Sequence, residues 1–279
     1  MMGEQLGQDP QILREQEYAD DGHLDVRRRT HQLYTVDPVD FGQWTLERLV
    51  WQGDERVLDV GCGPGDLLRE MARQHQGWGA LIGLDFSAGM IAKASGLARD
   101  LPVRFFVGDA QSLSFPDASF EVVLARHMLY HVPDIGQAVA EAARVLGPSG
   151  RFLTVTNSAH TMADYTAFRR SAAAHLPGVV EPELASGRFS LENAPAWLEP
   201  HFREIETHIL RGTLRFPSAQ PFVDYFASAR AMSMQPGHSE AEWQAVLEYV
   251  SAQVEAVIAR QGHFDVGKVT GAVVGVKKG

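Results

Sequence analysis

Cysteine is nearly absent from this chain of 279 residues, since Cys62 is its one cysteine. A lone cysteine excludes an internal disulfide and a cysteine-rich zinc site. No apolar run approaches the roughly 20 residues that cross a bilayer, and the opening stretch MMGEQLGQDPQILREQEYADD is polar and acidic, unlike a secretory signal. These absences predict a cytoplasmic protein without a membrane span.

Positive charge is also scarce, because the formal net charge is −10. Binding to a phosphate backbone relies on lysine and arginine displacing counterions, so the sequence predicts no nucleic-acid partner. The triplet Arg27, Arg28 and Arg29 is the one strong basic run, and a solvated helix face explains it better than a phosphate site. Hydrophobic residues at 45% and charged residues at 22% are ordinary values for a globular protein.

Strand-like and helix-like segments alternate regularly between residues 56 and 157, with no internal repeat and no low-complexity linker. Such alternation predicts a parallel sheet covered by helices on both faces. Five strands are expected at residues 56–60, 80–84, 103–107, 120–124 and 151–155, and two terminal strands at 204–210 and 266–276. The expected fold class is therefore α/β: a Rossmann-like, doubly wound, mostly parallel seven-stranded sheet with helical cap insertions.

The helices between these strands have recognisable ends. One is expected to begin near Gly65 or Asp66, one to start at an N-cap on Ser87 and run through Arg99, and one at 135–146 to stop at Gly147-Pro148. Residues 241–260 predict a further amphipathic helix. Its apolar stripe, interpreted as core, comprises Trp243, Val246, Leu247, Val250, Val254, Val257 and Ile258.

The strongest chemical signal is the glycine-dense turn that follows the first expected strand. Gly61, Gly63 and Gly65 follow Asp59, and glycine lets a ligand approach the backbone closely because it has no Cβ. Asp66 stands where a dinucleotide-binding loop has its third glycine, and a carboxylate there would repel a pyrophosphate. The turn therefore favours a zwitterionic amino acid, whose ammonium group Asp59 can pair with.

At these residues the sequence resembles the class I S-adenosylmethionine-dependent methyltransferases, over roughly residues 56–157. The resemblance implies S-adenosylmethionine as cofactor, with Asp85 on the ribose hydroxyls and Asp109 on the adenine amino group. Ala110 would donate its backbone N–H to the adenine, and Phe86 and Met90 would flank the adenine or ribose. The implied binding set is completed by residues of the turn and of the next strand end, namely Asp59, Gly61, Cys62, Gly63 and Arg126.

Cys62 is interpreted as a small residue that fits the turn, because no resolving cysteine or nearby base accompanies it. This argues against cytosine-C5 chemistry. The Asn/Asp-Pro-Pro-Tyr/Phe tetrapeptide typical of adenine-N6 and glutamine methylation is absent after the fourth expected strand.

In its place stands the segment ARHMLYHVPD, residues 125–134, which resembles the ubiquinone/menaquinone-methyltransferase-like branch of bacterial small-molecule enzymes. The resemblance implies backbone contacts from Ala125 and Arg126 to the methionine moiety. His127, Tyr130 and His131 are the candidate catalytic residues, because an imidazole can take a proton from a hydroxyl or amine at neutral pH. A helical turn would place His127 and His131 on one side, although histidines that only bond loops share this spacing. No third ligand at useful spacing accompanies them, so no metal site is expected.

The regions outside the alternating core are expected to cover the end of the sheet where ligands bind. A single domain is predicted, with a helical lid at 1–50, the cofactor-binding core at 51–157, helical caps at 158–200 and 212–262, and a terminal strand at 263–279. The segments 14–18 and 31–34 resemble the lid of the same family, which implies that Tyr34 closes over the cofactor; ordinary packing is the alternative.

The expected function is methyl transfer to a small, apolar or aromatic acceptor, at oxygen, nitrogen or carbon. A non-catalytic cofactor sensor or partner-binding protein on the same fold remains the alternative. A nicotinamide-dependent oxidoreductase is disfavoured by Asp66. Fold alone does not decide between these.

Overall fold

The computed structural model describes residues 22–176, 187–230 and 238–279, and these divide into two compact units of interleaved segments. The sheet unit takes the described residues of Val39–Ala159, Ala185–Leu210 and Thr270–Gly279. The helical unit takes those of Met1–Pro38, His160–Leu184 and Arg211–Val269. The single domain expected from the sequence stays a prediction, and composition alone does not reveal that the helical segments build a core of their own.

Eight strands form one mixed sheet in the described residues, in the order β1-β7-β8-β6-β5-β2-β3-β4. Five are parallel neighbours: β2 (Arg56–Val60), β3 (Ala80–Asp85), β4 (Val103–Val107), β5 (Phe120–Arg126) and β6 (Leu146–Asn157). The long strands β7 (Phe202–Phe216) and β8 (Phe264–Lys277) contribute residues to both units, and β8 is antiparallel to β6. All seven predicted strands are present. The eighth, β1 (Thr35–Val36), has two residues, too few to produce an alternation in the sequence.

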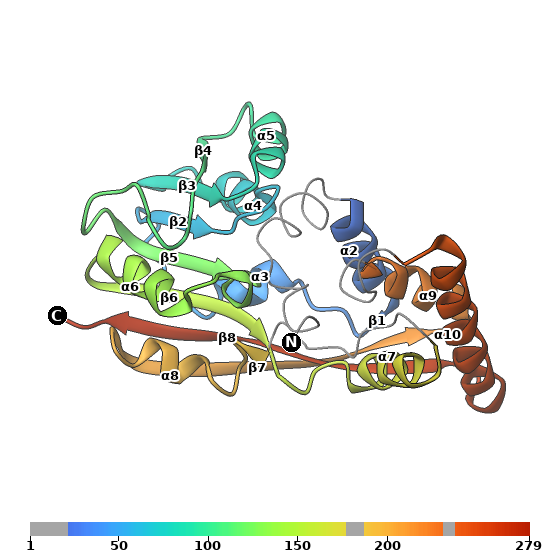
Figure 1. Ribbon diagram of the computed structural model, residues 1–279. Helices are drawn as coiled ribbons and strands as arrows, with labels where there is room; N and C mark the ends of the chain where they lie inside the picture. The colour runs from blue at the N-terminus through green and yellow to red at the C-terminus, as the bar shows by residue number, and fades with distance from the viewer. Residues whose placement is uncertain (1–21, 177–186, 231–237) are drawn as a thin grey trace. The chain divides into compact units, whose positions relative to one another are not determined.

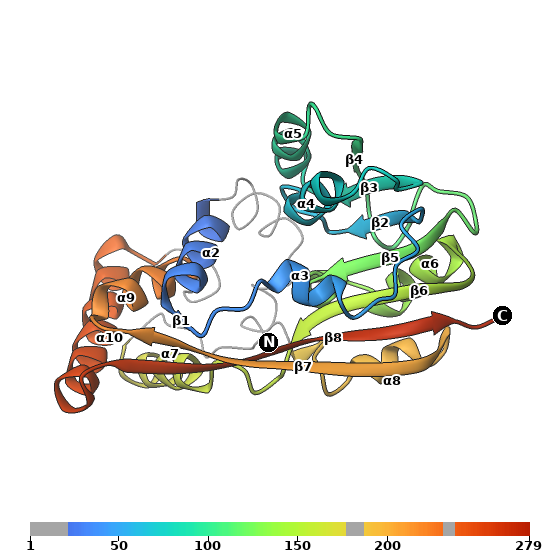
Figure 2. The same cartoon turned by 180° about the vertical axis from the view of Figure 1, so that it is seen from behind.

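Helices cover both faces of the parallel strands, as a doubly wound sheet requires. On one face, α3 (Phe41–Leu46) and α4 (Asp66–Gln74) bury Leu46, Leu68 and Met71 against strand residues. Figure 1 shows α6 (Ile135–Val145) in front of the sheet, and Figure 2, from behind, shows α3 in front. The sheet unit also contains α5 (Ala88–Leu97), the short 3₁₀ helix η2 (Leu129–His131) and α8 (Ala194–Leu198).

The start of α5 follows the sequence, and the end of α6 differs from it. Ser87 caps α5 by accepting from the Met90 N–H at 3.2 Å, as predicted. Helix α6 ends at Val145, but Gly147-Pro148 lies inside β6 and does not form a separate stop. The pairing of β5 with β6 jumps from Phe120↔Leu146 to Val122↔Arg151, so the residues between are accommodated as an irregularity of the strand.

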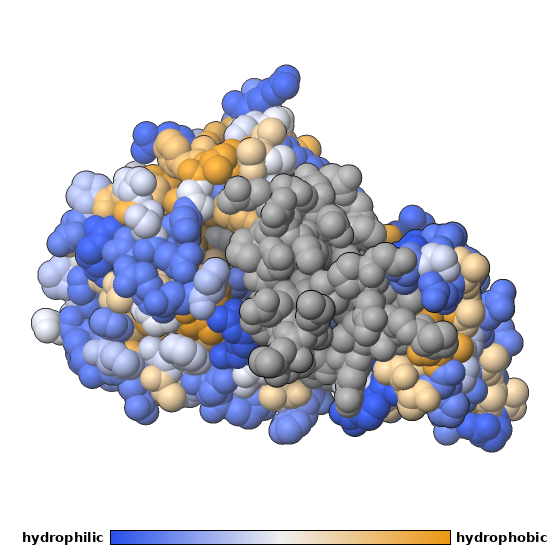
Figure 3. Space-filling model, viewed as in Figure 1, coloured by the Kyte–Doolittle hydropathy of each residue, from blue (hydrophilic) through white to orange (hydrophobic). Residues whose placement is uncertain are grey.

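The edge strand β4 leaves apolar side chains in solvent. Phe106 is 42% exposed and Val107 57% exposed, and Leu97 of the neighbouring α5 is 47% exposed. Figure 3 shows hydrophobic residues gathered at the top of the view, over β4 and α5. Phe106 and Val107 lie at the carboxyl end of β4, shortly before Asp109 in the chain.

The helical unit has its own core. It contains α2 (Gly22–Tyr34), α7 (Ala163–His175), α9 (Ala219–Ala227) and α10 (Glu240–Gln261). The stripe predicted on α10 is confirmed: Trp243, Val246, Val250 and Val254 are buried, while Leu247, Val257 and Ile258 are partly buried beside them. None of the described helices combines the length and apolar character that crossing a membrane needs.

The predicted cap at 158–200 is divided between the units. Helix α7 belongs to the helical unit, whereas α8 belongs to the sheet unit, where Leu198 is fully buried. The predicted lid segment at 14–18 lies outside the described residues.

Candidate active site

The glycine turn after β2 has the backbone geometry that its sequence requires. Gly61 and Gly63 have φ values of 68° and 54°, in the left-handed region that residues with a Cβ rarely occupy. A Cβ on Gly61 would lie 2.7 Å from the Met128 side chain, whereas one on Gly63 would have no atom within 4 Å. The turn therefore packs closely at Gly61 and is open at Gly63, where a ligand has room to approach.

Asp85, at the carboxyl end of β3, joins this turn to the start of α5. Its Oδ2 accepts the Gly63 N–H at 2.9 Å, and its Oδ1 accepts the Ser87 N–H at 2.9 Å. Burial raises the pKa of this carboxyl, and the two backbone donors oppose that rise. Each carboxylate oxygen keeps a further lone pair, so the geometry is compatible with the ribose role that the sequence predicts.

Asp59 lies at the carboxyl end of β2 and is completely buried. The sequence predicts that it pairs with a ligand ammonium, but its partner in the structure is the Arg126 guanidinium, 3.5 Å from Oδ2. Its other oxygen, Oδ1, is buried and has no hydrogen-bond partner within residues 22–176, 187–230 and 238–279. Burial raises the pKa of Asp59, and Arg126 opposes that rise.

Cys62, the second residue of the turn, is buried. Burial, Asp59 and Asp85 together raise the pKa of its thiol well above the ordinary value. A thiol of this kind stays protonated at neutral pH, and the thiolate is the nucleophile. This agrees with its interpretation as a small residue that fits the turn.

Asp109 and Ala110 follow β4, the next strand end along the sheet. Asp109 is exposed, and its Oδ1 accepts the Gln111 N–H at 2.8 Å, while Ala110 is buried. Asp109, the third predicted acid, is therefore open to solvent, and its carboxylate accepts hydrogen bonds from Gln111.

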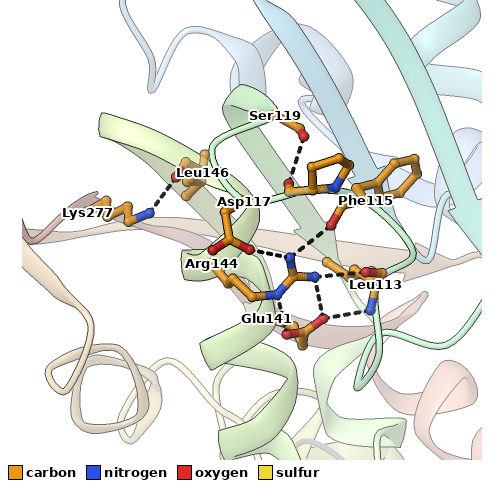
Figure 4. A network of polar contacts seen from close by, with 9 residues as sticks. Leu113, Phe115, Asp117, Ser119, Glu141, Arg144, Leu146 and Lys277 are labelled. Atoms are coloured by element: carbon orange, nitrogen blue, oxygen red, sulfur yellow. Dashed lines mark hydrogen bonds and ion pairs between the residues drawn. The ribbon is translucent and has the colours of Figure 1, made fainter.

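The loop after Asp109 is fixed by Arg144 of α6, which the sequence did not reveal (Figure 4). Its guanidinium donates to the carbonyls of Leu113 and Phe115 and to the carboxylate of Asp117, each at 2.8 Å, and to Glu141 at 2.7 and 2.8 Å. Glu141 in turn accepts the Leu113 N–H at 2.7 Å. This network holds the loop between β4 and β5 against α6.

The other predicted cofactor residues lie at the start of α5. Met90 is buried, and Phe86 is partly exposed beside Asp85. Asp66 begins α4 and pairs with Arg69 of the same helix, so a carboxylate does stand at this helix start.

The segment after β5 carries the candidate catalytic residues, and it is not an α-helical turn. His127 has a left-handed φ of 52°, its N–H donates to the Val155 carbonyl at 2.8 Å, and only residues 129–131 are helical, as the 3₁₀ helix η2. The expected helical turn over His127 and His131 is wrong, because this φ breaks the helix at its first residue. The His127 ring stacks on Phe41 at 5.9 Å, and the His131 ring lies edge-on to Tyr130 at 4.5 Å.

Arg188 holds this segment in place, and sequence reasoning missed it. Its guanidinium donates to three main-chain carbonyls, those of Tyr130 at 3.2 Å, Val132 at 3.0 Å and Pro133 at 2.8 Å. An arginine 55 to 58 residues away in the chain gives no local signal of such contacts.

Tyr34 belongs to the helical unit, where its ring packs against Phe216 at 5.2 Å between centroids. It ends α2, directly before β1. Its closure over the cofactor stays a prediction.

Comparison with known proteins agrees with this arrangement. A methyltransferase-domain family matches residues 58–154, which contain the glycine turn and the three strand ends. The 27-O-demethylrifamycin SV methyltransferase of Amycolatopsis mediterranei is 32% identical over 196 residues, covering 67% of each chain. The 2-phytyl-1,4-naphthoquinone methyltransferase of a Synechocystis strain is 37% identical over 118 residues, covering 39% of this chain and 50% of that one.

A solved structure, a putative methyltransferase from Bacillus halodurans, superposes with a TM-score of 0.61 at 19% identity, covering 86% of this chain and all of that one. Matches to two further curated relatives span 43% and 36% of those proteins' lengths, so the chain spans half or less of several relatives it matches. On the extent of the rifamycin-enzyme match, and on the fold and motifs above, the chain belongs to the class I S-adenosylmethionine-dependent methyltransferases.

Proposed function

We propose that this protein transfers a methyl group from S-adenosylmethionine to a small-molecule acceptor. The observation that carries the proposal is the contact between Asp85 and Gly63, because it brings a strand-end carboxylate onto the open part of the glycine turn. Family membership supports the same reading.

The residues present fit this cofactor. Gly63 has open space at the position of a Cβ, so a ligand could approach the backbone there. Asp59, shortly before the turn in the chain, is fully buried, and its Oδ1 has no hydrogen-bond partner in the described part of the chain. Asp85 would hold the ribose, Asp109 and Ala110 the adenine, and Phe86 and Met90 would flank it. Gly61, Cys62 and Gly63 would approach its amino-acid end. The cofactor supplies a methyl group on a sulfonium. Holding such a group in line with the acceptor can lower the activation barrier by roughly 7–11 kcal/mol.

The acceptor would lie against the segment that carries His127, Tyr130 and His131. One of these side chains would take the proton of a hydroxyl or amine acceptor, typically worth about 10²–10⁴ in rate. Relatives named for a phytyl-naphthoquinone and a rifamycin support an apolar or aromatic acceptor. The methylated atom stays open among oxygen, nitrogen and carbon, and a cytoplasmic location stays a prediction from composition.

Calorimetry with S-adenosylhomocysteine, the demethylated product, tests cofactor binding without knowledge of the acceptor. We expect Asp85→Ala to weaken binding tenfold or more, since a hydrogen bond to a charged group contributes roughly 1.5–3 kcal/mol. Asp100→Asn is the control, because this exposed residue precedes the amino end of β4, whereas the glycine turn lies at the carboxyl ends of the strands. Unchanged affinity in a folded Asp85→Ala protein would refute the ribose assignment.

Methyl transfer itself is tested by incubating the protein with S-adenosylmethionine and a bacterial metabolite extract. The expected result is a metabolite whose mass rises by one methylene unit. If S-adenosylhomocysteine forms slowly with every extract while the cofactor still binds tightly, the protein is a sensor and the proposed activity is wrong.

A further inference from the structure

The parallel pairing of β2 with β5 brings a buried acid and an arginine together at the amino-acid end of the proposed pocket. Asp59 is opposite Leu124, and Arg126 is two residues beyond Leu124 on the same strand. Side chains two apart on a strand share a face, so Asp59 and Arg126 meet on one face at 3.5 Å.

The two side chains differ in what a ligand can reach. Asp59 is 0% exposed, whereas the Arg126 side chain keeps 20% of its surface in solvent. A ligand at the turn can therefore reach the Arg126 side chain, but it cannot reach the Asp59 carboxylate.

Charge around Cys62 supports the same assignment. The charges of Asp59 and Asp85 raise the pKa of the Cys62 thiol, and the charge of Arg126 lowers it. Both acids and the arginine thus surround one residue of the turn, and Arg126 is the one cation among them. Among the residues that the structure describes, neither the buried Asp59 Oδ1 nor the buried Arg126 Nε has a hydrogen-bond partner, so these neighbours do not saturate the pair.

We propose that the Arg126 side chain binds the carboxylate of the cofactor's amino-acid portion, and that Asp59 is a positioning residue that holds the guanidinium there. This rests on the proposed function, since it assumes an adenosyl amino acid in the pocket. It reverses the roles predicted from the sequence, which gave Asp59 the ligand's ammonium group and Arg126 a backbone contact only.

Three probes separate these roles by calorimetry on the full chain. S-adenosylhomocysteine carries both charged groups, its decarboxylated analogue lacks the carboxylate, and 5′-methylthioadenosine lacks the whole amino acid. Arg126→Gln should weaken S-adenosylhomocysteine at least tenfold and change the other two by less than twofold. Asp59→Asn should weaken S-adenosylhomocysteine as well, and the double variant should bind it no more weakly than Arg126→Gln.

The matched control is Arg104→Gln, which removes one exposed arginine of β4 and should leave all three affinities unchanged. Arg126→Lys keeps the charge and should retain part of the affinity, which guards against misfolding of the glutamine variant. The inference is overturned if Arg126→Gln binds S-adenosylhomocysteine as well as or better than wild type, which would mean that the guanidinium competes with the ligand's ammonium. Equal weakening of all three probes would also overturn it. If wild type binds none of the probes, the proposed function itself fails.

Discussion

His31 illustrates how strongly one residue depends on distant parts of the chain. Its Nδ1 lies 3.2 Å from the Nζ of Lys268, which also donates to the Thr35 hydroxyl at 2.8 Å. Burial, and then the charge of Lys268, lower the pKa of His31 to about 4, and burial also lowers the pKa of Lys268. The ring of Tyr225 packs edge-on against the imidazole. The imidazole is therefore neutral at pH 7.

The stability of the protein should fall as the pH drops from about 6.5 toward 4. In this window the unfolded chain protonates His31 while the folded chain does not, so the unfolded state binds more protons and the free energy of unfolding decreases. Because the ring is only partly buried, we expect a loss of about 1–3 kcal/mol. Urea unfolding at pH 4.5 and 7 measures it, with His31→Gln as the comparison. An equal pH dependence in both proteins would contradict the low pKa.

At the scale of elements, the loop after β5 is held by side-chain hydrogen bonds from Arg188, which are not the hydrogen bonds of a helix or strand. Arg188 bonds the carbonyls of residues 130, 132 and 133, and His127 breaks the helix with its left-handed φ. The backbone that carries the candidate catalytic side chains is thus positioned by Arg188 and by the left-handed conformation of His127.

Replacing Arg188 should loosen this loop without emptying the cofactor site. In Arg188→Gln we expect hydrogen exchange of the amides at 130–132 and 134 to accelerate, and stability to fall by about 1–3 kcal/mol as three carbonyls lose a charged donor. The affinity for S-adenosylhomocysteine should change less than twofold. Arg203→Gln, at an arginine whose side chain is 50% exposed, is the control. Exchange at these amides equal to wild type would show that the loop is held by other contacts.

These elements also show what the sequence could and could not predict. The sequence predicts strands such as β2 and the cap on Ser87 because buried runs and capping residues act within a few positions. The contacts of Arg126 and Arg188 depend on residues that are 67 and 55 to 58 positions away, and a single sequence carries no signal for such pairs. The sequence predicts the end of α6 at Leu146, one residue beyond its end at Val145, because the irregular pairing of Leu146 is a property of the sheet.

At the scale of the whole molecule, the chain forms two hydrophobic cores, one in each unit, and two strands contribute residues to both units. The helical core contains the fully buried Phe216, Phe222 and Phe226, and the sheet core contains Val57, Leu68 and Leu124. Strands β7 and β8 pass through both units. The cofactor residues with described contacts at the glycine turn, namely Asp59, Gly61, Cys62, Gly63, Asp85 and Arg126, all belong to the sheet unit.

Hydrogen exchange with and without S-adenosylhomocysteine tests whether the helical unit takes part in binding. The amides of 60–65 and 85–90 should be protected directly, because ligand binding lowers the population of open states by mass action. If Tyr34 acts as the predicted lid, the protection should extend to residues 31–36 of the helical unit. The variant Tyr34→Phe keeps the ring that packs on Phe216 and should therefore preserve the fold. It tests the contribution of the tyrosine hydroxyl alone. Protection confined to the sheet unit would contradict the lid, and Tyr34 would then be a packing residue of the helical core.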